Sequence, residues 1–180
     1  GTQTVHSVPV YTDWSLGTMR AAMKNQFNVI YILTNSRALT AAQTESLHRE
    51  LVRNLEQAAR EEEQEFILIS RSDSTLRGHY PLETEVIYRE LTAEGSAGRI
   101  DGEIIIPFFF EGGRVTFNDI HYVKTESGFL PAGESEFAHD PTFGYQASDL
   151  KQWVEEKTKG AYRAAEVKSI PLALLRSGKL

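Results

Sequence analysis

The chain has 180 residues, of which 41% are hydrophobic and 24% are charged, a balance typical of a soluble globular domain with its own core. Its net charge is −6 and its basic residues form no continuous run, which argues against nucleic acid as a partner. It has no cysteine, so disulfides, thiolate metal sites and cysteine nucleophiles are excluded.

The sequence also argues against a membrane location. No apolar run approaches the roughly 20 residues of a membrane span, and the first ten residues lack the pattern of a signal peptide. With cysteine absent, we expect a cytoplasmic protein.

Strands and helices alternate along the first half of the chain. β-Branched and apolar residues predict strands at 4–10 and 27–34, with a short helix at 14–26 between them. Thr40 and Gln43 form a capping box that begins a long helix with one apolar stripe. The uniformly apolar residues 66–70 then predict a central strand covered on both faces.

The second half continues the alternation. A helix is expected from Pro81 to about Glu94, stopped by Gly95, and residues 103–110 predict another buried strand. Residues 114–123 predict a hairpin that turns at Asn118-Asp119. Ser148 should cap a further helix, residues 164–170 should return as a strand, and residues 169–180 resemble a helix at its start.

This order predicts an α/β fold with three layers, a mostly parallel sheet and an inserted β-hairpin. We expect residues 1–180 to form a single domain. In such a sheet, ligands bind beyond the carboxyl ends of the strands. Three polar loops fall at that edge, and each carries one of the arginines Arg37, Arg77 and Arg114.

These loops predict a site for a small acid. Guanidinium groups bind carboxylate or phosphate through paired hydrogen bonds. Asp73 and Ser74 could hold ligand hydroxyls, and Gly78 and Gly113 would let backbone N–H groups approach ligand oxygens. The alternative is structural: Asp73 could cap its own loop, Arg77 could pair with Glu83, and Arg114 could be an ordinary charge at the edge of the hairpin.

Other chemistries have little support. No histidine spacing suggests a metal site. The nucleotide-binding motifs G-x-x-x-x-G-K-[ST] and G-x-G-x-x-G are both absent from the sequence. A hydrolase using Ser74 or His79 rests on composition alone, since no G-x-S-x-G elbow occurs. The residues by themselves leave the reaction open.

Several motifs in order resemble one family. The sequence "SDSTLRG" with a glutamate on the next helix resembles the D-S-T-L-R-G-x-x-x-x-E signature of the four-carbon acid sugar kinases. The segments "NSRAL" (35–39), "IIPFFFEGGRVT", "IHYV", "ESEFAHDP" (134–141) and "ASDL" are similar to other family segments in the same order. The resemblance covers residues 35–150.

The resemblance implies the N-terminal, substrate-binding domain of a two-domain kinase that uses ATP and Mg²⁺ to phosphorylate erythronate, threonate or 3-oxo-tetronate. The family's A-D-D-x-T-G strand and its C-terminal ATP domain are missing here, so we expect a chain truncated at both ends, with neither ATP nor metal bound and no activity alone. The C-terminal ATP domain is the expected partner, and a homodimer is compatible with the sequence. A relic or stand-alone scaffold module is the alternative.

The resemblance also assigns roles. Arg37 and Arg77 would hold the substrate carboxylate, and Asp73 and Ser74 its hydroxyls. Gly78 belongs to the same motif, and Gly113 and Arg114 could approach the substrate or the incoming phosphate. The catalytic base would lie in the missing strand, with Asp73 as the reserve candidate.

Overall fold

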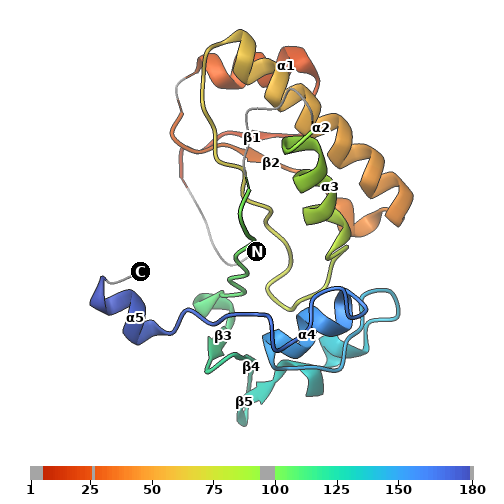
Figure 1. Ribbon diagram of the computed structural model, residues 1–180, viewed down its shortest axis with the longest axis vertical. Helices are drawn as coiled ribbons and strands as arrows, with labels where there is room; N and C mark the ends of the chain where they lie inside the picture. The colour runs from red at the N-terminus through yellow and green to blue at the C-terminus, as the bar shows by residue number, and fades with distance from the viewer. Residues whose placement is uncertain (1–5, 26, 94–99, 179–180) are drawn as a thin grey trace. The chain divides into compact units, whose positions relative to one another are not determined.

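A computed structural model describes residues 6–25, 27–93 and 100–178, and the backbone divides into two compact units (Figure 1). The first unit consists mainly of Gln3–Arg71 and Pro81–Ile104, and the second mainly of Ser72–Tyr80 and Ile105–Leu180. In the described part of the chain, no helix is long and apolar enough to cross a membrane.

The first unit combines three helices with a short parallel strand pair. Its elements are β1 (Val10–Tyr11), α1 (Leu16–Lys24), β2 (Tyr31–Ile32), α2 (Ala41–Glu61) and α3 (Leu82–Leu91). The predicted capping box is confirmed: the Thr40 hydroxyl accepts from the Gln43 N–H while the Gln43 side chain accepts from the Thr40 N–H. The long helix α2 packs against both α1 and α3, and this packing helps to bury its apolar stripe.

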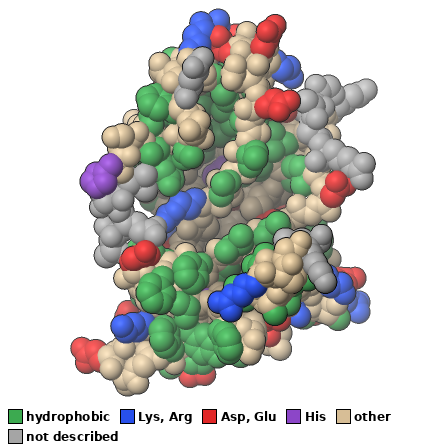
Figure 2. Space-filling model, turned by 90° about the vertical axis from the view of Figure 1, so that its left-hand side faces the viewer, with side chains coloured by type: hydrophobic (Ala, Val, Ile, Leu, Met, Phe, Trp, Pro, Cys, Tyr) green, Lys and Arg blue, Asp and Glu red, His purple; other side chains and the backbone are tan. Residues whose placement is uncertain are grey.

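The prediction of a buried central strand at residues 66–70 is wrong. This segment forms no strand in the structure. Phe66 and Leu68 pack against the helices, but Ile67 and Ile69 are 91% and 82% exposed. One face of the segment is therefore covered and the other is open. Residues 103–108 likewise form no strand, and Ile104 is exposed; Figure 2 shows hydrophobic side chains at the molecular surface.

The second unit is built on a three-stranded antiparallel sheet in the order β3-β4-β5. Its elements are β3 (Arg114–Phe117), β4 (Ile120–Thr125), β5 (Gly128–Pro131), α4 (Leu150–Lys157) and α5 (Leu172–Ser177). The hairpin prediction is confirmed, since Phe117 pairs with Ile120 across Asn118 and Asp119. Both turn residues have positive φ, 47° and 67°, as a two-residue hairpin turn of the primed type requires.

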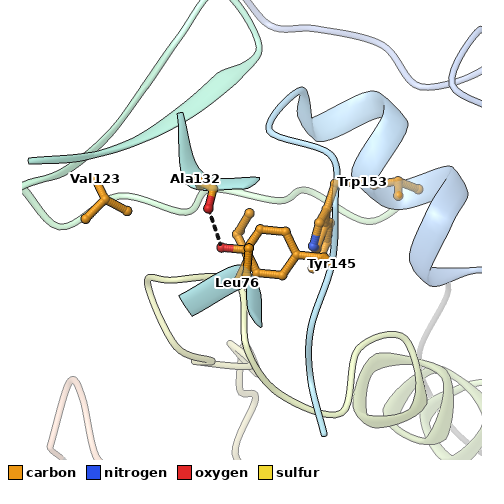
Figure 3. Close-up of a cluster of buried hydrophobic side chains, with 7 residues drawn as sticks. Leu76, Val123, Ala132, Tyr145 and Trp153 are labelled. Carbon is orange, nitrogen blue, oxygen red and sulfur yellow. Dashed lines mark hydrogen bonds between the residues drawn. The ribbon is translucent and has the colours of Figure 1, made fainter. Parts of the chain in front are cut away.

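A hydrophobic cluster joins this sheet to α4 (Figure 3). Its buried side chains include Val123 of β4, Trp153 of α4, Tyr145 of the segment before α4, and Leu76 of the loop that follows residue 71. Tyr80 stacks on Trp153 with ring centroids 4.7 Å apart. The cluster therefore holds the 72–80 segment against the sheet and helix of its own unit.

Some further predictions need correction. The N-cap of α4 is Asp149, whose carboxylate accepts from the Lys151 and Gln152 N–H groups. Ser148, the predicted cap, instead accepts from the Gly133 N–H. Residues 164–170 form no strand, because no described strand pairs with them.

The remaining predictions have different outcomes. The helix expected near residue 171 is α5. The stop expected at Gly95 lies outside the described residues. The fold is mixed α/β, but the prediction of a mostly parallel sheet is wrong for the described residues, whose strands form one parallel and two antiparallel pairings. The strands expected at residues 66–70 and 103–110, which would have extended the parallel sheet, do not form. The three-layer form of the fold stays a prediction.

Candidate functional site

The loop of residues 72–78, "SDSTLRG", belongs to the second unit and has a tightly turned backbone. The Leu76 N–H donates to the Asp73 carbonyl at 3.0 Å, which closes a turn over Ser74 and Thr75. Leu76 itself has φ 64°, a left-handed conformation that costs a non-glycine residue about 1–2 kcal/mol. Its side chain is buried in the hydrophobic cluster, and this packing offsets the backbone strain.

Arg77 lies between two carboxylates. Its Nε and Nη2 donate to Asp73 Oδ2, each at 2.9 Å, and its Nη1 lies 3.5 Å from Asp140 Oδ2. All three side chains are about one fifth exposed, so the ion pairs are partly shielded from water and from salt screening. The arrangement fixes the Arg77 guanidinium plane relative to the loop.

Both carboxylates are ionised at neutral pH. Burial raises the pKa of Asp73, but hydrogen bonds from Thr75 and the charge of Arg77 outweigh burial, and the net pKa is lowered. Backbone N–H groups of Phe143 and Thr142 lower the pKa of Asp140, with a smaller contribution from Arg77. A carboxylate with a lowered pKa is a good hydrogen-bond acceptor and a weak base.

Arg114, the first residue of β3, shares an aromatic ring with Arg77. The Arg114 and Arg77 guanidinium carbons lie 5.4 Å and 4.9 Å from the centre of the Phe137 ring, within cation–π range. Arg114 Nη1 donates to the Gly112 carbonyl at 2.5 Å. Its Nε is buried and has no hydrogen-bond acceptor among the described residues.

The two glycines of the predicted site have local structural reasons. Gly78 has φ 148°, and a Cβ there would lie 2.7 Å from Ser72 Oγ. Gly113 has φ 74°, and a Cβ there would lie 2.6 Å from the Lys124 Cβ on β4. Both positions favour glycine by conformation and by space, so neither glycine by itself indicates a ligand.

The structure brings most of the predicted site residues into one unit. Asp73, Ser74, Arg77 and Gly78 lie in the 72–78 loop, and Gly113 and Arg114 lie at the start of β3 in the same unit. Arg37 belongs to the first unit, where it is exposed in a 3₁₀ turn (Ser36–Ala38). The predicted grouping of Arg37 with the other arginines stays a prediction.

Sequence reasoning missed four residues of this cluster: Phe137, Asp140, His121 and Tyr145. Asp140 lies within the segment "ESEFAHDP" (134–141), one of the segments that carry the family resemblance, and this resemblance was the available signal. Phe137 lies three residues earlier in that same segment, with nothing to distinguish it from a core aromatic residue. His121 and Tyr145 contact backbone carbonyls of the loop, and such contacts leave no pattern in a sequence.

A surface hollow of about 410 Å³ also lies in the second unit, bordered by Gly133, His139, Gly144, Tyr145 and Glu156. Its one carboxylate, from Glu156, accepts hydrogen bonds from the Gln146 and Ala147 N–H groups. No arginine or lysine borders it, so it is poorly suited to an anion. No group of three or more His, Asp or Glu side chains within the described ranges could hold a metal ion.

Comparison with known proteins gives one match. A family model described as the sugar-binding N-terminal domain matches residues 1–179. Searches of curated proteins and of solved structures found no match. The family match covers both units and confirms the resemblance drawn from the ordered motifs.

Proposed function

The chain belongs to the family of sugar-binding N-terminal domains, and we propose that it binds the four-carbon sugar acid substrate of an ATP-dependent kinase. The sugar acid would be of the erythronate, threonate or 3-oxo-tetronate type. The family match supports the binding of a sugar. The acid class and the kinase rest on the motif resemblance and on the chemistry of the second unit.

The main observation that supports an acidic ligand is that Arg114 lacks an ion-pair partner in the described part of the chain. Arg77 is matched by two carboxylates, whereas Arg114 forms no ion pair among the described residues and keeps a buried Nε without an acceptor. A buried, unsatisfied donor on a charged group costs at least about 1–3 kcal/mol. A ligand carboxylate would supply the missing charge by accepting hydrogen bonds from the guanidinium group.

The remaining loop groups suit the hydroxyls of such a ligand. The Asp73 carboxylate is a strong acceptor, and the half-buried Ser74 carries a hydroxyl that can both donate and accept. Arg77 would act by holding Asp73 in place, and could share its fork with the ligand. The lowered pKa of Asp73 favours a hydrogen-bonding role for it over the role of general base.

ATP and Mg²⁺ would come from outside this chain's described residues. These residues contain no cluster of carboxylates and histidines that fits a metal ion, and the sequence has no phosphate-binding glycine motif. From the resemblance to the four-carbon acid sugar kinases, we propose that a C-terminal domain supplies them. Transfer of the γ-phosphoryl group then depends mainly on positioning and charge stabilisation, and this chain would position the acid.

Titration calorimetry tests the assignment of Arg114. We expect wild-type protein to bind erythronate or threonate, and Arg114→Met to weaken that binding about 10–100-fold, because a hydrogen-bonded charge contact is worth about 1.5–3 kcal/mol. Arg163→Met, which changes an exposed arginine of the same unit, is the matched control and should bind as wild type does. Equal affinities for wild type and Arg114→Met would contradict the assignment.

A further inference from the structure

His121 of β4 is fully buried and joins the hairpin to the 72–78 loop. Its Nε2 lies 2.8 Å from the Ser74 carbonyl oxygen, and its Nδ1 lies 2.9 Å from Thr116 Oγ1. A carbonyl oxygen only accepts hydrogen bonds. The Nε2 of His121 must therefore carry a proton and donate it towards the loop backbone.

The next carbonyl of the loop is also held by a buried side chain. The Tyr145 hydroxyl donates to the Thr75 carbonyl at 2.8 Å, and the Ala132 carbonyl, at 3.5 Å, is its more distant acceptor. Consecutive carbonyls are thus held by side chains from two different segments, His121 of the hairpin and Tyr145 of the segment before α4. This double attachment matters because the loop contains Leu76 at positive φ, and a strained backbone persists only where its surroundings determine it.

The other side of His121 is less strictly determined. Thr116 Oγ1 lies 2.9 Å from His121 Nδ1 and 3.0 Å from the Pro107 carbonyl, yet the hydroxyl has a single hydrogen to donate. Burial, with a smaller contribution from Arg114, lowers the pKa of His121 against the opposing effect of Ser74. With a neutral ring, Thr116 can satisfy either Nδ1 or Pro107, whereas the Nε2–H bond to the loop is always present.

We propose that His121 is a positioning residue for sugar-acid binding. Its Nε2–H group fixes the Ser74 carbonyl, and through the loop backbone it holds Asp73 and Arg77 in their ion-paired geometry. The ligand part of this inference rests on the proposed function. The loop part rests on the contacts of His121 alone, so the two can be tested separately.

Two substitutions of His121 separate its contacts. The amide nitrogen of His121→Gln reaches about as far as Nε2 and can still donate to Ser74, whereas His121→Asn reaches only as far as Nδ1 and keeps the Thr116 contact. We expect erythronate affinity within about threefold of wild type for His121→Gln and at least tenfold weaker for His121→Asn. Equal affinity of His121→Asn and wild type would overturn the positioning role.

Nuclear magnetic resonance of the wild-type protein tests the loop contact without a ligand and without a substitution that could unfold the chain. We expect the ring nitrogens of His121 to show a protonated Nε2 and an unprotonated Nδ1 at neutral pH, and the Arg77 Nε–H to be protected from exchange. A proton on Nδ1 with none on Nε2 would overturn the inference. If no four-carbon acid binds wild type, the proposed function and the ligand part fail together, and the ring-nitrogen signals still decide the loop contact.

Discussion

The Gly113 position offers a quantitative test of how tightly the start of β3 packs. Gly113→Ala places an L-residue at φ 74° and a methyl group 2.6 Å from the Lys124 Cβ. Gly160 is a matched control in the same unit, with φ 83° and no atom within 4 Å of the place that a Cβ would occupy. The two substitutions share the backbone cost and differ in the contact.

The shared part of the change is small. A left-handed L-residue costs about 1–2 kcal/mol, and replacing glycine returns about 0.4–1 kcal/mol by restricting the unfolded chain. Gly160→Ala should therefore cost roughly 0–1.5 kcal/mol in the free energy of unfolding. Gly113→Ala adds the forced displacement of Lys124, typically about 1–3 kcal/mol for overpacking.

Urea denaturation followed by tryptophan fluorescence measures the difference, since Trp153 lies in the core of this unit. We expect Gly113→Ala to be less stable than Gly160→Ala by about 1–3 kcal/mol. If the free energies of unfolding of Gly113→Ala and Gly160→Ala agree within about 0.5 kcal/mol, the backbone at Gly113 can move away from Lys124. That result would refute the close-packing explanation of Gly113.

Two further predictions concern pH and catalysis. Burial, the largest influence, raises the pKa of Tyr145 to about 12, so the hydroxyl ionises at lower pH in the unfolded chain than in the folded one. Its contribution to the free energy of unfolding should therefore be fully present below pH about 10 and should be lost as the pH rises towards 12. The free energy of unfolding should fall less over this pH range in Tyr145→Phe than in wild type. Denaturation series at pH 9–12 in which both proteins lose the same free energy of unfolding per pH unit would contradict this. With ATP, Mg²⁺ and a panel of four-carbon acids, we expect the isolated chain to give no phosphorylated product, and measurable turnover would refute its dependence on a second domain.

Local signals in the sequence predicted the helices and the hairpin correctly. The capping box at Thr40 and Gln43 and the Asn118-Asp119 turn act through contacts a few residues apart, so the sequence contains all that is needed to infer them. The cap of α4 was misplaced by one residue because Ser148 and Asp149 are both good N-caps. Only the tertiary contact of Ser148 with Gly133 distinguishes them.

The strand predictions failed where pairing and cover depend on distant residues. The apolar run at residues 66–70 is the same whether one face or both are covered, and the structure covers only the face of Phe66 and Leu68. Residues 164–170 have strand-like composition but no described strand beside them. Composition indicates which segments can form strands, and partners decide which segments do.

The candidate site was predictable in part. The 72–78 loop was identified by its residue types and by its motif, and Arg114 by a second motif. The shared Phe137 ring, the Asp140 ion pair and the His121 contact arise from segments about 40–65 residues further along the chain, which a single sequence does not relate to the loop. These contacts pair Arg77 with two carboxylates, Asp73 and Asp140, so Arg77 is not the free anion-binding group that its motif suggests.

The most direct test of sugar-acid binding by the second unit is chemical-shift mapping of the ¹⁵N-labelled chain during titration with erythronate and threonate. We predict saturable shifts in the backbone signals of residues 73–78 and 112–114 and in the side-chain Nε–H signal of Arg114, with the signals of the middle of α2 unchanged. Saturable shifts confined to the first unit, or none with any four-carbon acid, would contradict the account.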